Sequence, residues 1–345
     1  MNTFGKIFTL TSYGESHGAA IGGVIDGMPA GLHIDFDSVA REMARRRPGS
    51  SALVTARNEA DEVEFLSGIM DGVTLGTPIG FCIRNTQQHS ADYDNLKHAY
   101  RPGHADFTYQ AKYGIRDHRG GGRASARETA ARVVAGALAK QVLAKYGVTV
   151  SARLARVGGV ENTATEPDAL CSEVQEVIMR AKAEGDSVGG VVECTVHGCP
   201  VGLGEPVAGK LQALFAAAMM SIPAAKGFEY GMGFAGADKR GSEVIDSWQS
   251  APSDPRGIRA AANNSGGIQG GISNGEDIVM RIAFKPTATL LRDVHTVTDQ
   301  GEDTVLKARG RHDPCVAVRA VPVVEAMAAM TILDAMLISR ALIRF

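Results

Sequence analysis

The sequence has few cysteines, almost no net charge and no long uninterrupted apolar run. Its five cysteines include no C-x-x-C pair, which argues against a zinc site or a disulfide framework and favours a reduced, cytoplasmic protein. A formal net charge of −2 provides no overall field that would recruit nucleic acid or an acidic membrane. Without a run of about 18 apolar residues we expect no membrane-spanning helix. The first ten residues lack the apolar core of a signal peptide.

Glycine, in contrast, is abundant. The 345 residues include 41 glycines, well above the average share of roughly 7%, so we expect many tight turns and close backbone contacts. The hydrophobic share of 44% and the charged share of 21% are typical of a globular protein. The length suffices for one large domain or two smaller ones.

Several glycines belong to an internal repeat. A pattern that runs from Gly14 to Gly31 recurs from Gly185 to Gly202, with every position offset by 171 residues (185 − 14 = 171). Segments 68–79 and 267–278 form a second similar pair. The copies have diverged, because His17 of the first stands where the second has valine. A doubled chain usually folds as two packed halves with room for a site between them. We therefore predict one domain, 1–345, with halves of about 1–150 and 151–345.

Hydrophobic periodicity indicates an α+β fold. The strand-like segments neighbour one another and do not alternate regularly with helices, which favours antiparallel sheets over a Rossmann-type sheet. The clearest helix spans about 125–145, with apolar residues at helical spacing and Gly147 at its end. The other expected helices are 38–47, 104–113, 167–184, 207–221 and 322–342. The expected strands are 3–13, 19–26, 62–70, 78–84, 188–197 and 278–284.

Segment 14–18 permits more than one interpretation. Its G-x-S-x-G pattern matches a hydrolase nucleophile elbow with Ser16 as the nucleophile, but an elbow needs a helix after the turn. The residues after Gly18 are strand-like, which favours a glycine turn with a capping serine. His17 in this turn and His104 at a helix start are two imidazoles in glycine-bounded turns. A lone histidine is more often structural, whereas two in such turns indicate acid–base chemistry.

Arginines surround a run of three glycines at 120–122. Arg119, Arg123 and Arg127 lie beside this bare backbone at the start of the clearest helix, an arrangement suited to holding phosphate. The spacing is not that of a P-loop, which also carries a lysine. Segments 45–47, 285–289 and 311–315 add further basic groups, with His312 and Asp313 in the last. Basic groups thus outnumber acids in these segments, and we predict a small polyanionic ligand in a local pocket.

Together these residues resemble the chorismate synthase family. Three blocks carry the likeness, 14–29, 122–129 and 311–325, and segments 101–106 and 266–271 also fit. The likeness covers nearly the whole chain, in order and at compatible spacing. It implies a 1,4-anti elimination of phosphate from 5-enolpyruvylshikimate 3-phosphate, which gives chorismate in the shikimate pathway. The family's reaction needs reduced FMN and has no net redox change.

The resemblance also implies roles for individual residues. His17 and His104 match the two catalytic histidines, which protonate the reduced flavin and the departing phosphate. Asp313 matches an acid that assists proton removal near flavin N5. Arg46 matches a basic position that contacts nucleotide or substrate, and we expect Arg101, Arg119 and Arg127 to act with it. No metal site is predicted. The positions that match flavin-binding segments are Arg123, Ala124, Ser125, Pro223, Ala224, Gly270, Lys285, Pro286, Thr287, Ala288, Thr289 and Arg311.

The resemblance further implies a fold and an assembly. The family packs helices between two antiparallel four-stranded sheets in two pseudo-symmetric halves, and it forms homotetramers. We expect a separate flavin reductase, because no strand–GxGxxG–helix unit with a following acid is present. A flavin- or nucleotide-binding protein without catalysis remains an alternative, although it would not need both histidines.

Four positions depart from the family's pattern. Pro223 stands where asparagine is frequent, and Ala124 and Ala288 stand where serine is frequent. The two serine losses remove hydroxyl contacts to the flavin. Ala52 replaces an arginine that some members carry, which puts a role for NADP in doubt.

Overall fold

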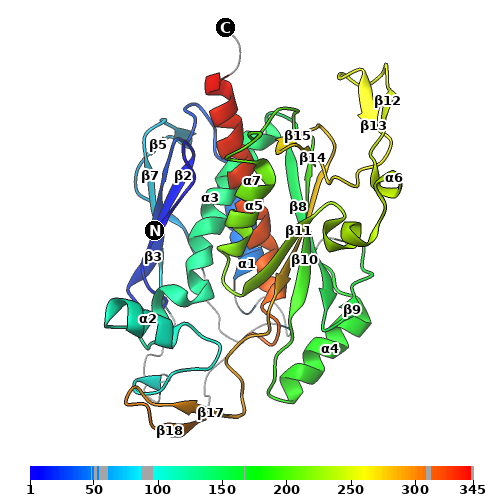
Figure 1. The fold of residues 1–345 in the computed structure, drawn as a ribbon. Helices are drawn as coiled ribbons and strands as arrows, with labels where there is room; N and C mark the ends of the chain where they lie inside the picture. The colour runs from blue at the N-terminus through cyan, green and yellow to red at the C-terminus, as the bar shows by residue number, and fades with distance from the viewer. Residues whose placement is uncertain are drawn as a thin grey trace.

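The chain folds into an α+β structure in which helices lie between two antiparallel sheets (Figure 1). The computed structural model describes residues 1–47, 49, 53, 61–86, 96–166, 168–307 and 312–342. Arg311 and Ala52, two positions of interest in the sequence, therefore lie outside the described residues. The α+β class with antiparallel pairing agrees with the prediction.

The first sheet has the spatial order β1 (Thr3–Phe4), β2 (Thr9–Tyr13), β3 (Ala20–Asp26), β7 (Ile79–Arg84) and β4 (Glu64–Phe65). The second has the order β11 (Ala225–Tyr230), β16 (Ile278–Phe284), β10 (Gly190–His197), β8 (Thr149–Val157) and β9 (Val160–Glu161). Among the described residues each sheet is thus five-stranded, and the predicted count of four was wrong. The additional strands are two-residue pieces at the edges, too short to leave a pattern in the sequence.

The α-helices are α1 (Phe36–Arg46), α2 (Asp106–Tyr113), α3 (Thr129–Ala144), α4 (Ser172–Ala183), α5 (Leu211–Met220), α6 (Gly241–Val244) and α7 (Ala317–Leu342). Short antiparallel hairpins pair β5 (Ile69–Met70) with β6 (Val73–Thr74), β12 (Trp248–Ser250) with β13 (Ile258–Ala260), β14 (Ile268–Gln269) with β15 (Ile272–Ser273), and β17 (Asp293–Val297) with β18 (Asp303–Lys307).

The central helices contact both sheets. Helix α3 packs on β2 and β3 of the first sheet and on β8 of the second, and α7 packs on β8 and β10. The two helices also make the largest helix–helix contact, where a Cβ added to Gly136 would lie 2.3 Å from Cβ of Ala326. By length and composition α7 could cross a membrane, but 89% of its most apolar window is buried inside the protein. It is the central core helix.

Both sheets have the same strand order in the same chain order. The first contains β2-β3-β7-β4 and the second β8-β10-β16-β11. In each, a helix follows the second strand (α1 or α5), a short hairpin precedes the next long strand (β5–β6 or β14–β15), and a long helix ends the series (α3 or α7). Helix α4 interrupts the match, because nothing corresponds to it between β2 and β3.

Gly27 and Gly198, equivalent positions of the sequence repeat, adopt the same backbone conformation. Their φ angles are 73° and 67°, in the region that favours glycine. A Cβ on Gly27 would lie 1.8 Å from the carbonyl oxygen of Ile7, and one on Gly198 would lie 2.3 Å from that of Gly147. Each of these carbonyls lies two residues before the first long strand of its half. The same close approach therefore requires glycine in both copies.

Asp334 joins the last helix to the start of the first sheet. Its nearly buried carboxylate accepts hydrogen bonds from the backbone N–H groups of Lys6 (3.1 Å), Ile7 (2.7 Å) and Phe8 (3.0 Å). These N–H groups precede β2 and would otherwise need other acceptors. The C-terminal helix thus stabilises the path by which the chain enters the first sheet.

Candidate active site

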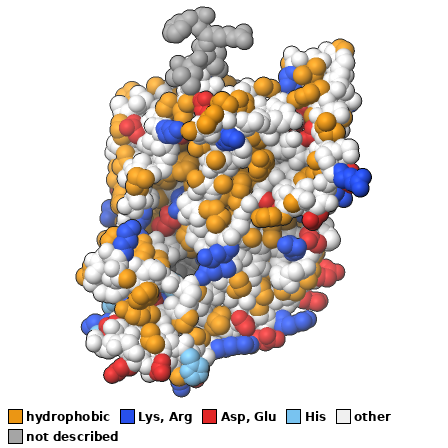
Figure 2. All heavy atoms as spheres, in the orientation of Figure 1, with side chains coloured by type: hydrophobic (Ala, Val, Ile, Leu, Met, Phe, Trp, Pro, Cys, Tyr) orange, Lys and Arg blue, Asp and Glu red, His pale blue; other side chains and the backbone are white. Residues whose placement is uncertain are grey.

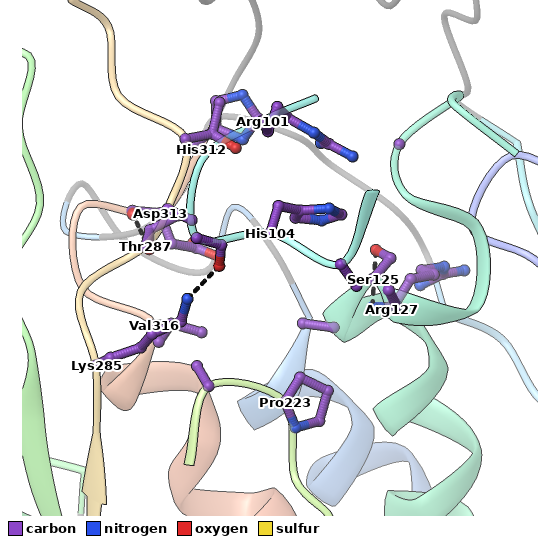
Figure 3. A pocket seen from close by; sticks show the side chains of 18 of the residues that line it. Arg101, His104, Ser125, Arg127, Pro223, Lys285, Thr287, His312, Asp313 and Val316 are labelled. Atoms are coloured by element: carbon purple, nitrogen blue, oxygen red, sulfur yellow. Dashed lines mark hydrogen bonds between the residues drawn. The ribbon is translucent and has the colours of Figure 1, made fainter. Parts of the chain in front are cut away.

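One cavity of about 460 Å³ collects most of the predicted site residues (Figure 3). Its walls come from the β2–β3 turn, the loops before α2 and α3, and the segments after α5, after β16 and before α7. Both halves of the chain therefore contribute to it. The predicted residues that line it are His17, Arg46, Arg101, His104, Ala124, Ser125, Arg127, Pro223, Ala224, Lys285, Pro286, Thr287, Ala288, Thr289 and Asp313.

His17 lies in the turn between β2 and β3 and is almost buried. Its Nδ1 is 3.1 Å from Oγ of Ser16, which donates its own hydrogen to the carbonyl oxygen of Gly120 (3.2 Å). Because the hydroxyl has a single hydrogen, Oγ accepts from the imidazole, and this arrangement assigns a proton to Nδ1. Ser16 thereby fixes the ring against the glycine loop.

The same turn excludes the hydrolase interpretation of Ser16. A nucleophile elbow places its serine between a strand and a helix, with Oγ exposed. Here the turn joins two strands, and Ser16 is only 1% exposed. Its hydroxyl is occupied by His17 and Gly120.

His104 immediately precedes α2 and projects between Arg101 and Ser125 in the view of Figure 3. Its Nδ1 is 3.0 Å from Oδ1 of Asp106, the first residue of that helix. Arg101 holds the same carboxylate through Nε (2.8 Å), Nη2 (2.8 Å) and its backbone N–H (3.0 Å). Burial works against the ionised form of Asp106, but the hydrogen bonds from Arg101 and His104 outweigh it and lower its pKa.

The glycine run at 120–122 brings the two histidines together. All three glycines have positive φ, and the loop continues into two 3₁₀ turns, Gly122–Ala124 and Ala126–Glu128, so that α3 begins only at Thr129. A Cβ on Gly120 would lie 2.2 Å from Nδ1 of His17, and one on Gly121 would lie 2.8 Å from Cε1 of His104. Two consecutive glycines therefore separate the two imidazoles.

A buried cluster of charge lies beneath the loop. Asp61 accepts hydrogen bonds from Nη1 of Arg46 (3.1 Å) and from Nη1 of Arg127. Burial raises the pKa of Asp61, but these two arginines hold it below its ordinary value. Nη2 of Arg127 is buried and has no hydrogen-bond partner among the described residues. A buried donor of this kind is costly unless a ligand accepts from it.

Arg46 is 1% exposed, yet it remains charged at neutral pH. Burial, together with Arg319, lowers its pKa to about 9. Its Nη2 donates to the carbonyl oxygen of Ala126 (2.8 Å), and its Nε donates to Oγ1 of Thr129 (3.2 Å). The guanidinium thus supports the start of α3 as well as lining the cavity.

Asp313 lies across the cavity on the segment before α7. Its Oδ2 accepts a 2.6 Å hydrogen bond from Nη1 of Arg319, and its backbone oxygen accepts from Oγ1 of Thr287 (2.8 Å). Arg319 also donates from Nε to the backbone oxygen of Arg46 (3.0 Å). One arginine therefore joins Asp313 to the end of α1.

The floor of the cavity contains a strained residue. Ala224 has a φ of 68°, a left-handed conformation that costs a non-glycine residue roughly 1–2 kcal/mol. Its carbonyl accepts from the backbone N–H of Lys285 (2.9 Å). Burial, with Lys226 nearby, lowers the pKa of Lys285, whose Nζ donates to the carbonyl oxygen of Gly103. Strain of this kind is found at functional sites.

Four predicted residues are not brought to this cavity. Arg119 is half exposed, pairs with Asp117, and lines a neighbouring cavity with Arg123. Arg123 uses its guanidinium on the backbone oxygens of Gly14 and Ser12 and on Oγ of Ser12, so it supports β2. Gly270 lies in the β14–β15 turn and lines a separate cavity beside α5 and β11. The fourth, Arg311, lies outside the described residues.

Sequence reasoning missed several lining residues, among them Tyr109, His312 and Arg319. His312 adjoins Asp313 in a segment already singled out and could have been included. Arg319, a cation near the start of the long C-terminal helix, was also a visible signal. Asp61 gave no such signal, because its importance comes from two arginines distant in the sequence.

The second copy of the repeated turn lies behind the opposite wall. Ser187 donates to the backbone oxygen of Thr287 (2.8 Å), and the N–H of Val188 donates to the oxygen of Pro314 (2.8 Å). The first copy thus contributes His17 to the cavity, whereas the second supports the loops that carry Thr287 and Asp313. In the described residues no group of three His, Cys, Asp or Glu side chains is placed to hold a metal ion.

Comparisons with known proteins agree with this arrangement. The sequence model of the chorismate synthase family matches residues 8–337. The chain belongs to the chorismate synthase family. Chorismate synthase from Parabacteroides distasonis is 55% identical over 99% of both chains, and that from Bacteroides fragilis is 56% identical over 98% of both. A crystal structure of a chorismate synthase superposes with a TM-score of 0.75 at 31% identity, covering 97% of this chain and 93% of the other.

Membership in the chorismate synthase family is consistent with a cavity that collects two histidines and several arginines. The match covers both sheets apart from β1, and it covers the central helices up to residue 337 of α7. Every loop that contributes to the cavity lies within the matched residues. The family relationship therefore applies to the site as well as to the fold.

Proposed function

We propose that this protein is a lyase that converts 5-enolpyruvylshikimate 3-phosphate to chorismate by 1,4-anti elimination of phosphate. The observation that carries the proposal is the convergence of two histidines, an aspartate and several arginines on one cavity between the halves. The substrate has one phosphate and two carboxylates, and arginine is suited to hold both groups. Family membership supports the same activity.

The residues present also fit reduced FMN. Bare backbone at Gly120, Lys285, and the buried Nη2 of Arg127, which has no hydrogen-bond partner in the described part of the chain, are features that suit a phosphate-bearing ligand. The residues proposed to hold it are Ala124, Ser125, Pro223, Ala224, Lys285, Pro286, Thr287, Ala288 and Thr289. When bound, reduced FMN supplies electron density that helps phosphate depart and is then recovered.

The chain's own residues then have distinct tasks. Arg46, Arg101 and Arg127 neutralise the ground-state anions of the substrate. His104 donates a proton to the departing phosphate, and His17 donates one to the flavin. Asp313, held by Arg319, would assist removal of the proton from the substrate carbon. Acid–base groups of this type act as charge develops in the transition state.

Anaerobic phosphate release tests the proposal directly. Purified protein, photoreduced FMN and 5-enolpyruvylshikimate 3-phosphate should yield one phosphate and one chorismate per substrate. Oxidised FMN and a reaction without flavin are the controls, and neither should release phosphate. Binding of both ligands without turnover would instead identify a non-catalytic flavin-binding protein and overturn the proposal.

The proposal extends to organisation and assembly. The matching strand orders and the equivalent glycines support one domain of two pseudo-symmetric halves, 1–150 and 151–345. We infer a cytoplasmic homotetramer supplied with reduced flavin by a separate reductase. Exposed apolar residues such as Val207, Met220 and Phe234 support subunit contacts, and apolar side chains gather over the α5 region in Figure 2. Sedimentation at micromolar concentration tests the assembly, and a monomer would contradict it.

A further inference from the structure

Asp106 lies behind His104, on the side away from the main cavity. Its carboxylate is 3.0 Å from Nδ1 of the imidazole and is 3% exposed. His104 lines both the main cavity and the neighbouring cavity of about 880 Å³, whereas Asp106 lines only the neighbouring one. The carboxylate therefore approaches the ring from behind, and the opposite ring nitrogen is the one available to the main cavity.

The carboxylate of Asp106 has a fixed orientation. Arg101 donates to Oδ2 from both its backbone N–H and Nε, and to Oδ1 from Nη2. Nη1 of Arg116 lies 3.7 Å from Oδ1. Three hydrogen bonds from a single residue leave little freedom for this side chain to rotate. An ionised carboxylate can only accept hydrogen bonds, so Nδ1 of His104 must carry a hydrogen.

The groups around His104 make this carboxylate important. Arg101 and Arg116 lie on its own side. Lys285, just after β16, donates to the carbonyl of Gly103, and His17 lies beyond the glycine pair. All of these are cationic or can become so. Asp106 supplies the negative charge in direct contact with the ring.

We propose that Asp106 is a positioning residue that holds His104 as the Nδ1–H tautomer, with Nε2 directed into the cavity. His104 then accepts and donates its catalytic proton at Nε2 alone. Arg101 serves this arrangement through Nε and Nη2, so part of its effect on turnover comes through the histidine. The expected effect on kcat rests on the proposed function, whereas the assignment of the ring hydrogen to Nδ1 does not depend on it.

The tautomer is measured on the unmodified protein. Long-range ¹H–¹⁵N spectra, with His104→Gln to assign the signals, report which ring nitrogen carries the hydrogen above the imidazole titration. We expect Nδ1 to read as protonated at every pH and Nε2 to lose its proton. A neutral ring with its hydrogen on Nε2 would overturn the proposal, whether or not the protein releases phosphate.

Asp106→Asn tests the consequence for catalysis. An amide in this place can present its NH₂ to Nδ1 and favour the opposite tautomer. We expect kcat for phosphate release to fall by about 10²–10⁴-fold, with substrate affinity changed less than about threefold. The pH at which kcat is half-maximal should also shift, because the charge beside the ring is lost. An unchanged kcat and pH profile would make Asp106 a structural anchor for Arg101 only.

Asp254→Asn is the matched control. Arg256 holds Asp254 through its backbone N–H (2.8 Å), Nε (2.9 Å) and Nη2 (2.7 Å), the same three donors that Arg101 uses on Asp106. This pair lies two residues apart in the β12–β13 hairpin, without a histidine. This variant should keep full kcat. A comparable loss from both substitutions would count against the proposal.

A double variant removes the ambiguity of misfolding. In the His104→Ala background, Asp106→Asn should reduce kcat by less than about threefold, because the group through which it acts is gone. If Asp106→Asn lowers kcat in the His104→Ala background by the same factor as in the wild-type protein, the proposal is overturned. If Asp106→Asn does not fold, Asp106→Glu retains the charge for Arg101 but displaces the carboxylate from the ring. It should still lower kcat by at least about tenfold, and wild-type kcat in that variant would contradict the assignment.

Discussion

Gly120 lies so close to the imidazole of His17 that a Cβ atom added to it would be 2.2 Å from Nδ1. Backbone at this position thus forms the surface against which the ring rests. Ser16 also secures the ring through Oγ, 3.1 Å from the same nitrogen.

Gly120→Ala should therefore reduce turnover by displacing His17. A displacement of about 1 Å at a reacting group can cost about 10²-fold in rate, and single-turnover phosphate release measures it. Gly147→Ala is the control, since Gly147 also has positive φ (72°) but nothing lies within 4 Å of its Cβ position. Equal loss of turnover in both would show that backbone strain, and not the histidine, is responsible.

His104→Ala and Arg127→Ala should separate proton transfer from binding. We expect the histidine variant to lose about 10²–10⁴-fold in kcat with little change in substrate affinity. We expect the arginine variant to bind substrate or FMN about 10–100-fold more weakly, because its partnerless Nη2 would no longer meet an anion. Equilibrium titration and single-turnover rates, both with reduced FMN and without oxygen, measure the two effects. Normal turnover of a saturated His104→Ala enzyme would refute the acid–base role.

Asp61 should make the free energy of unfolding depend on pH in the acid range. Its pKa is lowered in the folded protein, so its contribution is complete above the unfolded value of about 3.9 and is lost as pH falls through the folded value. Asp61→Asn leaves Arg46 and Arg127 without their carboxylate and should cost about 3–5 kcal/mol near pH 7. Denaturant unfolding at pH 3–7 should show that this difference shrinks at the acid end. A difference in the free energy of unfolding that stays constant from pH 7 to pH 3 would contradict this role of Asp61.

Ala224→Gly should stabilise the protein slightly or leave it unchanged. Relief of the left-handed strain, roughly 1–2 kcal/mol, exceeds the entropic cost of glycine, roughly 0.5–1 kcal/mol. Ala225→Gly, one residue on and at the start of β11, has no such strain to relieve and should destabilise. Urea unfolding compares the two variants. A loss at Ala224 as large as that at Ala225 would show that the surroundings of Ala224 already absorb the strain.

The periodic parts of the fold could be predicted from sequence. Strand β16 matches the predicted 278–284, and α1 and β10 match within about two residues, because their buried and exposed positions alternate clearly. Strand β8 was missed, since it follows α3 closely and mixes arginines with apolar residues. The β17–β18 hairpin was missed because most of its residues are polar or exposed.

The candidate site could be predicted where glycine and charge coincide in short segments. His17 and His104 were found in this way. Segment 285–289 has no glycine and was singled out by its basic residue and hydroxyls, and it lines the same cavity. The internal partnerships were not visible, because a sequence does not show which arginine meets which carboxylate. Arg123 was assigned to the flavin through the family resemblance, yet its donors face the backbone of β2. Asp61 was missed for the same reason.

The hydrogen bonds from residues 6–8 to Asp334 have a consequence for folding during synthesis. A growing polypeptide would have its first sheet complete long before residue 334 leaves the ribosome, and the inner face of that sheet packs against α3, which in turn packs on α7. Until α7 emerges, the apolar surface between the halves has no cover. The newly made N-terminal half should thus need shielding by chaperones, and the protein should reach its native state only after synthesis is nearly finished.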